Sequence, residues 1–159
     1  MLAYLSLGSN LGDRRDNLER AIIRLEEHGD VVLKSSFYET EPVEVTEQPW
    51  FLNCVVALAT EEAPDVLLEG MLKVERELGR VRDPRQKKGP RTIDIDILLF
   101  GDLVIHSQSL TIPHPEMQQR RFVLEPLVEI APCAFHPLLK ATAQELLSLV
   151  PTHPIVRKA

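Results

Sequence analysis

Isoleucine and aspartate alternate in one short stretch of the chain, and this pattern strongly limits the folds that the chain can adopt. Neighbouring side chains of a strand point to opposite faces of the sheet. We therefore expect Ile93, Ile95 and Ile97 to enter a core, while Asp94 and Asp96 share the other face. Half-polar strands of this kind favour an antiparallel sheet with helices packed on it.

The two aspartates predict a cation site. The two residues are two strand rises apart, about 6.6 Å. At that distance two unit charges repel each other by roughly 2.5 kcal/mol at an effective dielectric constant of about 20, and by about 0.6 kcal/mol in bulk water. A bound cation converts this repulsion into attraction. Both ligands are hard oxygens and no Cys or His lies nearby in the sequence, so Mg²⁺ is the expected metal, with phosphate completing its octahedron.

The alternative is an amphipathic strand with two solvated aspartates. A D-x-D motif alone is a weak signal, because short motifs often arise by chance. Aspartate is a poor strand former, however, and two of them in a run of Ile, Leu and Phe are a local inconsistency typical of a functional site. The surrounding residues therefore favour the metal site.

Length and charge exclude several classes of protein. A chain of 159 residues, 44% of them apolar, predicts a single domain over residues 1–159. The net charge of −6 argues against nucleic-acid binding, which needs a cationic surface. No apolar run approaches the ~18 residues of a membrane span, and no signal-peptide pattern is present, so we expect a cytoplasmic protein without a membrane partner. The scattered histidines lack zinc-ligand spacing.

Periodicity and turn residues predict the order of elements. We expect strands over residues 1–7, 31–38, 51–60, 93–100 and 103–105, and helices from Asn10 or Asp13 to Gly29, from Pro64 to Gly79, and from Thr142 to before Pro151. Residues 120–130 fit either a helix or an extended segment. The chain contains neither a P-loop nor a G-x-G-x-x-G motif. The expected class is α+β.

A basic segment leads into the aspartate strand. Between residues 80 and 91 there is one acid, Asp83, and six cations: Arg80, Arg82, Arg85, Lys87, Lys88 and Arg91. These cations can hold a polyphosphate while Mg²⁺ neutralises the remaining charge, as in phosphoryl transfer. We expect residues 82–89 to become ordered when a polyphosphate binds. The alternative is a solvated loop paired with acids such as Glu75 or Glu77.

Seven segments give the chain a resemblance to one family. They are Leu7–Gly12, Ser36–Thr40, Phe51–Asn53, Glu75–Arg80, Gly89–Asp96, Ile112–Pro115 and Arg121–Leu127. Together they resemble the successive signatures of 6-hydroxymethyl-7,8-dihydropterin pyrophosphokinases, from residue 1 to about residue 150. The Gly-Pro-Arg-Thr-x-Asp-x-Asp block is the most specific of them.

The resemblance implies a fold, a reaction and partners. The fold would be a ferredoxin-like antiparallel sheet with helices packed on both sides. The reaction would transfer the diphosphate of ATP to the hydroxymethyl group of 6-hydroxymethyl-7,8-dihydropterin, releasing AMP, in folate synthesis. The partners would be ATP and the pterin, with two Mg²⁺ ions, and we expect a monomer.

The resemblance also implies roles for individual residues. Asp94 and Asp96 would hold the two Mg²⁺ ions, and one of them would lie near the pterin hydroxyl. The catalytic residues would be Arg80, Arg91, Asp94 and Asp96. The ATP site would comprise Glu75, Arg80, Arg82, Lys88, Arg91, Ile97, Thr111 and His114. The pterin site would comprise Thr40, Val43, Phe51, Asn53 and Phe122.

The expected pterin residues make chemical sense together. Two aromatic faces can enclose a flat heterocycle, and Asn53 offers a donor and an acceptor to its amide-like edge. Taken alone, Phe51 and Phe122 each fit ordinary core packing. Phe51 and Asn53 are two positions apart on one strand and so face the same way, which favours the pocket.

The chain departs from the family pattern at three positions. Lys88 stands where many relatives have an aromatic residue, Ser109 where some have an arginine, and Glu41 where a proline is common. Two rival functions use the same residues: another Mg²⁺-dependent phosphotransferase or nuclease, and a non-enzymatic module that binds a small regulator. The acidic surface argues against a nuclease, and a regulatory module does not explain arginines beside paired aspartates.

Overall fold

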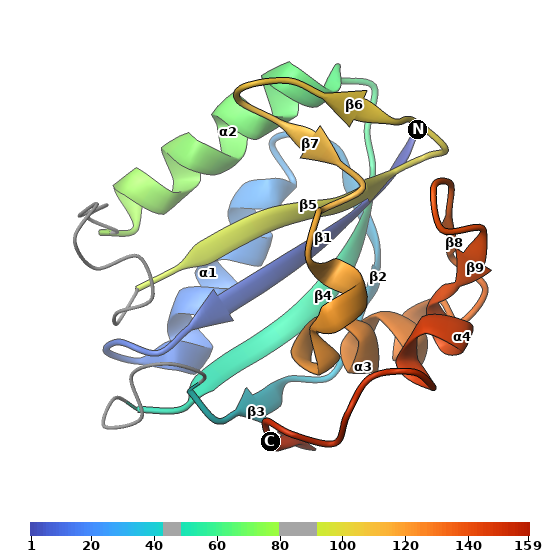
Figure 1. Ribbon diagram of the computed structural model, residues 1–159. Coiled ribbons are helices and arrows are strands. Elements are labelled where there is room, and N and C mark those ends of the chain that lie inside the picture. The colour runs from blue at the N-terminus through green and yellow to red at the C-terminus, as the bar shows by residue number, and fades with distance from the viewer. Residues whose placement is uncertain (43–48, 80–91) are drawn as a thin grey trace.

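The computed structural model describes residues 1–42, 49–79 and 92–159, which form an antiparallel sheet flanked by helices (Figure 1). The main sheet contains β1 (Leu2–Ser9), β2 (Asp30–Lys34), β3 (Tyr38–Thr40), β4 (Phe51–Ala59), β5 (Asp94–Phe100) and β10 (Val156–Lys158). Its order is β10-β3-β4-β1-β5, and β2 also pairs with β4. All these pairs are antiparallel, so the expected α+β sheet is confirmed.

The helices and two small hairpins complete the described fold. The α-helices are α1 (Arg14–Leu25), α2 (Pro64–Glu77), α3 (Arg121–Ile130) and α4 (Ala143–Leu147), and a 3₁₀ helix, η1, spans Met117–Gln119. One hairpin pairs β6 (Ile105–His106) with β7 (Thr111–Ile112), and the other pairs β8 (Phe135–His136) with β9 (Ala141–Thr142). No helix in the described parts of the chain is long and apolar enough to cross a membrane.

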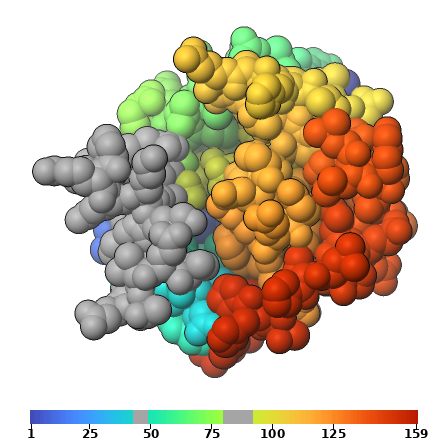
Figure 2. Space-filling model, in the orientation of Figure 1, coloured from blue at the N-terminus to red at the C-terminus, as the bar shows by residue number. Residues whose placement is uncertain are grey.

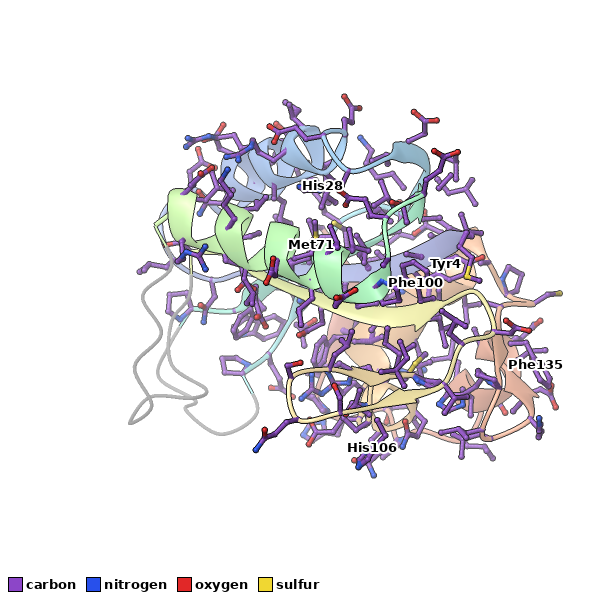
Figure 3. All side chains as sticks on the ribbon, turned by 90° about the horizontal axis from the view of Figure 1, so that it is seen from above. Tyr4, His28, Met71, Phe100, His106 and Phe135 are labelled. Carbon is purple, nitrogen blue, oxygen red and sulfur yellow. The ribbon has the colours of Figure 1, made fainter. Side chains whose placement is uncertain are left out.

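Two cores lie on opposite faces of the sheet. In Figure 3, α1 and α2 cover one face, and Met71 of α2 lies in the same core as Phe100 of β5. The helices α3 and α4 cover the other face, where Val55 and Leu124 are buried together. The expected helix packing on both sides is therefore confirmed.

The alternating strand has the predicted orientation. Ile93, Ile95 and Ile97 are at most 5% exposed and belong to the core under α1 and α2. Asp94 and Asp96 are partly exposed and lie on the opposite face. The period of two in the sequence thus predicts which residues of β5 are available to a ligand.

Some boundaries differ from the sequence-based expectations. Residues 31–38 form two strands instead of one, because the hydroxyl of Ser35 accepts from Val55 N at 2.9 Å and takes the place of a strand carbonyl. Asp13, one of the two expected alternatives, caps the first helix. The α-helix ends at Leu25, before the expected end at Gly29, and a tighter turn follows it to His28. The remaining differences lie in the second half of the chain.

The strand expected at 103–105 forms at Ile105–His106 as β6, and it pairs with β7, which the sequence pattern does not predict. Residues 120–130, left open between helix and extended chain, form α3 although Pro126 lies inside it. The helix after Thr142 begins with the expected capping box to Glu145 and ends at Leu147.

Candidate functional site

One transverse row of paired residues links the predicted pterin and metal residues. Tyr38 of β3 pairs with Asn53 of β4, Asn53 pairs with Gly8 of β1, and Gly8 pairs with Asp94 of β5. Directly opposite residues of antiparallel strands project to the same face. The backbones of Asn53 and Asp94 are two strand spacings apart, about 10 Å. An extended bicyclic molecule can therefore span the row between them.

Neighbouring rows enlarge this face. Thr40 pairs with Phe51 on one side of the row. On the other side, Ser6 pairs with both Val55 and Asp96. The pairing therefore brings Thr40, Phe51 and Asn53 together with both aspartates at one end of the sheet (Figure 1).

Gly8 allows the side chains of this face to lie close to the backbone of β1. A Cβ atom at Gly8 would lie 2.8 Å from Nδ2 of Asn53 and 3.6 Å from Cδ1 of Phe51. The missing side chain therefore leaves room for Asn53 to extend across β1 towards Asp94.

Two buried acceptors on the face have no hydrogen-bond partner in the described part of the structure. Thr40 is 3% exposed and Asn53 is 4% exposed, and Oγ1 of Thr40 and Oδ1 of Asn53 are both unpaired there. A buried polar atom without a partner costs about 1–3 kcal/mol. A ligand with suitably placed donor groups would remove this cost, so these atoms indicate a binding site.

Glu75 connects α2 to the aspartate strand. Its side chain is almost fully buried, and Oε2 accepts a hydrogen bond from the backbone N–H of Ile95 at 2.8 Å. Ile95 lies between the two aspartates, and β5 is the edge strand of the sheet. Glu75 therefore satisfies an outward N–H of the edge and fixes the strand that carries the aspartates.

A β-bulge brings His114 to the same strand. The register between β1 and β5 shifts between Tyr4 and Leu5, which leaves Leu98 as the extra residue. The carbonyl of Leu98 accepts from His114 N at 2.9 Å. The bulge thus supplies the backbone contact that holds the segment before η1 against β5.

The surroundings of His114 favour its neutral form. Burial lowers the pKa of His114 below its ordinary value, and Arg120 lowers it further, whereas the charges of Glu116 and Asp94 oppose the shift. The Nδ1 atom accepts from the backbone N–H of Glu116 at 3.1 Å. The neutral ring therefore carries its proton on Nε2.

Other predicted residues lie in different environments. Phe122, at the start of α3, is partly buried, and the Arg120 guanidinium lies 5.6 Å from the centre of its ring. Thr111 is partly buried in β7. The side chain of Ile97 is 5% exposed and packs in the core on the opposite face from the aspartates.

Several predicted residues lie outside the described residues. They are Val43, Arg80, Arg82, Lys88 and Arg91, together with the segment 82–89 that we expect to become ordered with polyphosphate. Their roles stay predictions.

Sequence reasoning missed two residues at this face. Gly8 lies just beyond the strand expected over residues 1–7, and its pairing with both Asn53 and Asp94 places it at the centre of the row. Arg120, which forms an ion pair with Glu116, was not singled out. The sequence feature that marks Arg120 is its position between two predicted site residues, His114 and Phe122.

The donor set fits Mg²⁺ held together with phosphate. Within the ranges that the structure describes, no group of three or more His, Cys, Asp or Glu residues is arranged to hold a metal. Asp94 and Asp96 nevertheless supply two hard carboxylates on one face of β5. Mg²⁺ is commonly bound by one or two carboxylates and the phosphates of a substrate, with water as the remaining ligands. Two carboxylates are sufficient for that mode of binding.

The face is accessible from one side of the molecule. Figure 2 shows a hollow beside the orange surface of η1 and the start of α3, with yellow-green atoms of β5 deeper inside. The helices α1 and α2 pack on the opposite face of the sheet, over Ile93, Ile95 and Ile97. These two helices therefore do not cover Asp94 and Asp96, which are partly exposed.

Comparison with known sequences decides the family. The sequence model of the 7,8-dihydro-6-hydroxymethylpterin-pyrophosphokinase (HPPK) family matches residues 4–132. The chain belongs to this family. The resemblance recognised in the sequence is therefore confirmed, and the matched HPPK region includes most of β1 and all of β3, β4, β5 and η1.

Two curated relatives share extensive sequence identity with the chain. The chain is 47% identical over 131 residues to the 2-amino-4-hydroxy-6-hydroxymethyldihydropteridine pyrophosphokinase of Bacillus subtilis, covering 81% of this chain and 77% of that protein. It is 42% identical over 156 residues to the folic acid synthesis protein fol1 of Schizosaccharomyces pombe, covering 97% of this chain. The chain spans only 21% of the length of that second protein.

A solved structure shows the same fold. The wild-type HPPK-DHPS of Plasmodium falciparum, solved with pteroate, aligns with a TM-score of 0.73 and 18% sequence identity. The alignment covers 92% of this chain and 42% of that one. At this identity the similarity establishes the HPPK fold of the chain.

Proposed function

We propose that the protein transfers the diphosphate group of ATP to the hydroxymethyl group of 6-hydroxymethyl-7,8-dihydropterin, releasing AMP, as a step of folate synthesis. Membership of the HPPK family makes the chain an enzyme of the pyrophosphokinase class. The observation that carries the proposal is the row Asn53–Gly8–Asp94, which aligns an unpaired amide oxygen with a carboxylate on one open face.

The pterin occupies the Asn53 end of the row in this proposal. Its ring N–H and amino groups donate to Oδ1 of Asn53 and Oγ1 of Thr40, which have no partner in the described structure. Phe51, beside Asn53, covers one face of the ring, and Phe122 of α3 covers the other. Gly8 leaves room for the side chains of Asn53 and Phe51 to lie over β1 beside the ring. The hydroxymethyl group then points towards Asp94 and Asp96.

ATP and Mg²⁺ occupy the aspartate end. Asp94 and Asp96 would hold two Mg²⁺ ions, and these ions, when bound, neutralise the phosphate charge and make the phosphorus a better electrophile. His114 donates from Nε2 to a phosphate oxygen, because its Nδ1 is already occupied by the Glu116 N–H. The predicted Arg80, Arg82, Lys88 and Arg91 would add cationic contacts to the same polyphosphate.

The described residues mainly position the two substrates. Phosphoryl transfer depends on alignment and charge stabilisation more than on covalent participation of the protein. Glu75 keeps the aspartate strand in place through Ile95, and the bulge at Leu98 keeps His114 beside it. Both contacts stabilise the aspartate end of the row, where the hydroxyl oxygen of the pterin and the β-phosphorus of ATP must meet.

Product analysis tests the proposal. The protein is incubated with ATP, Mg²⁺ and 6-hydroxymethyl-7,8-dihydropterin, and the nucleotides are separated by chromatography. Diphosphate transfer predicts one AMP for each diphosphorylated pterin. ADP as the pterin-dependent product would indicate single phosphate transfer by a different kinase. Absence of any pterin-dependent turnover would contradict the assigned substrate.

A further inference from the structure

The C-terminal strand joins the sheet beside the predicted pterin residues. β10 pairs with β3 so that Val156 lies opposite Thr40 and Arg157 lies opposite Glu39. Figure 1 shows the C-terminus next to β3, far along the chain from the strands that it completes. The family match ends at residue 132, so β10 lies outside it. The strand nevertheless contacts the edge of the pterin-binding face.

Two arginines from distant parts of the chain meet at Glu39 and Trp50. Arg14 of α1 binds Oε1 of Glu39 at 3.0 Å, and Arg157 of β10 binds Oε2 at 3.2 Å. Arg14 also donates to the carbonyl of Trp50 at 2.8 Å. The Arg157 guanidinium lies 4.6 Å from the centre of the Trp50 ring. The hydrogen bonds from Arg14 and Arg157 hold the pKa of Glu39 below its ordinary value, so the network stays charged.

Further contacts tie the flanking residues to the same network. The backbone N–H of Glu41 donates to the carbonyl of Ile155 at 3.1 Å, and Oε1 of Glu41 accepts from Ile155 N at 2.9 Å. The side chain of Asn10 donates to the carbonyl of Pro49 at 3.2 Å. The contacts therefore fix residues on both sides of Thr40 and immediately before Phe51.

We propose that Arg157, with β10, is a positioning residue that sets the affinity of the site for the pterin. This inference rests on the proposed function. Thr40 and Phe51 are paired with each other and carry an acceptor and an aromatic ring of the pterin site. Arg157 holds the residues next to them, Glu39 and Trp50, while its own side chain points away from the site face. ATP binds at the other end of the row and should be much less affected.

The expected effect is moderate, because the side chain of Arg157 is 63% exposed. Exposed ion pairs and exposed cation–π contacts are individually weak. We expect Arg157→Ala to raise the dissociation constant for the pterin about fivefold, which is the loss expected from two weak contacts together. The dissociation constant for an ATP analogue should change by less than about twofold.

Calorimetry with the full chain tests the inference. The pterin is titrated in the presence of Mg²⁺ and a non-hydrolysable ATP analogue, and the analogue with Mg²⁺ is titrated separately. Arg20→Ala is the matched control, since Arg20 of α1 is an arginine of similar exposure, 59%, in an exposed ion pair with Asp16. Arg157→Lys should recover part of the pterin affinity, because it retains the charge near Glu39. Trp50 is the one tryptophan of the sequence, so its emission reports directly on loss of the Arg157 contact.

The affinities of the variants for the pterin and for the ATP analogue decide between the possible outcomes. A selective loss of pterin affinity in Arg157→Ala, absent in Arg20→Ala, supports the positioning role. Equal losses for both ligands, or wild-type pterin affinity together with an altered Trp50 emission, overturn it and leave the proposed function standing. A wild-type protein that fails to bind the pterin overturns the proposed function and this inference with it.

Discussion

Asn53 and Asp94 lie in one transverse row of the sheet, with Gly8 between them. The amide of Asn53 is buried, and its oxygen is unpaired in the described structure. The carboxylate of Asp94 lies in the same row, on the edge strand β5. Neither residue is close to the other in the sequence. Their alignment follows from the central position of β1, which pairs with β4 on one side and with β5 on the other.

Substitution of either aspartate should abolish most turnover. We expect Asp94→Asn and Asp96→Asn each to reduce kcat below about a tenth of the wild-type value at saturating Mg²⁺, a barrier increase of more than about 1.4 kcal/mol. Each change removes one hard ligand from the metal–phosphate assembly. Steady-state AMP formation measures the effect. Asp102→Asn, at an exposed turn, is the control and should behave as wild type.

Residual turnover and retained folding decide the outcome for the two aspartate variants. Either variant with more than about a tenth of the wild-type kcat would contradict the role of that carboxylate. Circular dichroism should show that both variants remain folded, because both side chains are only partly buried.

Removal of the Phe51 ring should act on the pterin alone. Phe51→Ala should weaken pterin binding by about tenfold or more, the loss expected when a stacked aromatic contact of about 1.4 kcal/mol is removed. The affinity for an ATP analogue should stay close to the wild-type value. Calorimetry measures both. Phe135→Ala is the control, since Phe135 is half-exposed on the far hairpin β8–β9 (Figure 3). Equal losses for the two ligands would mean that Phe51 serves the core.

A methyl group at position 8 should disturb the centre of the row. In Gly8→Ala the new Cβ would lie 2.8 Å from Nδ2 of Asn53, which forces the amide to move. The amide is at the end of a side chain, so we expect little loss of stability but a pterin affinity reduced by about tenfold. Gly70→Ala is the matched control, because its Cβ would collide with the His28 ring away from the site. That variant should lose stability while the folded fraction binds the pterin normally.

His114 should make the folded protein sensitive to acid. Burial and Arg120 lower its pKa in the folded state below the ordinary value of 6.5. The unfolded chain therefore binds the proton more readily, and the free energy of unfolding should fall as the pH drops below 6.5 towards the folded-state pKa. His114→Gln removes this contribution, so its stability should depend less on pH in that window.

Urea unfolding at several pH values measures this effect. His136, whose pKa is also lowered by burial, contributes a loss of the same sign in both proteins and cancels in the comparison. The same acid sensitivity in His114→Gln and wild type would show that His114 is not held neutral.

The sequence predicts the parts of the site that depend on local periodicity. The orientation of Asp94 and Asp96 follows from the alternation with isoleucine, and the shared face of Phe51 and Asn53 follows from their spacing of two. The capping box at Thr142 is likewise a local pattern, and the structure confirms it. Such features need no knowledge of which strands pair.

The features that the sequence does not predict depend on register. The bulge at Leu98, which brings His114 to the aspartate strand, has no glycine or proline to mark it. The central position of Gly8 becomes apparent only when β4 and β5 pair with opposite sides of β1. The break at Ser35 arises because a hydroxyl replaces a backbone acceptor, and sequence alternation alone cannot show that contact.

A paramagnetic distance measurement tests the row most directly. Mn²⁺ replaces Mg²⁺, and NMR relaxation is recorded for bound pterin labelled at its hydroxymethyl carbon and at its amino nitrogen, with a non-hydrolysable ATP analogue present. Because the aspartates hold the metal at one end of the row and Asn53 holds the ring edge at the other, relaxation of the hydroxymethyl carbon should be enhanced far more than that of the amino nitrogen. Equal enhancement at the two labels, or stronger enhancement at the amino nitrogen, would contradict this arrangement.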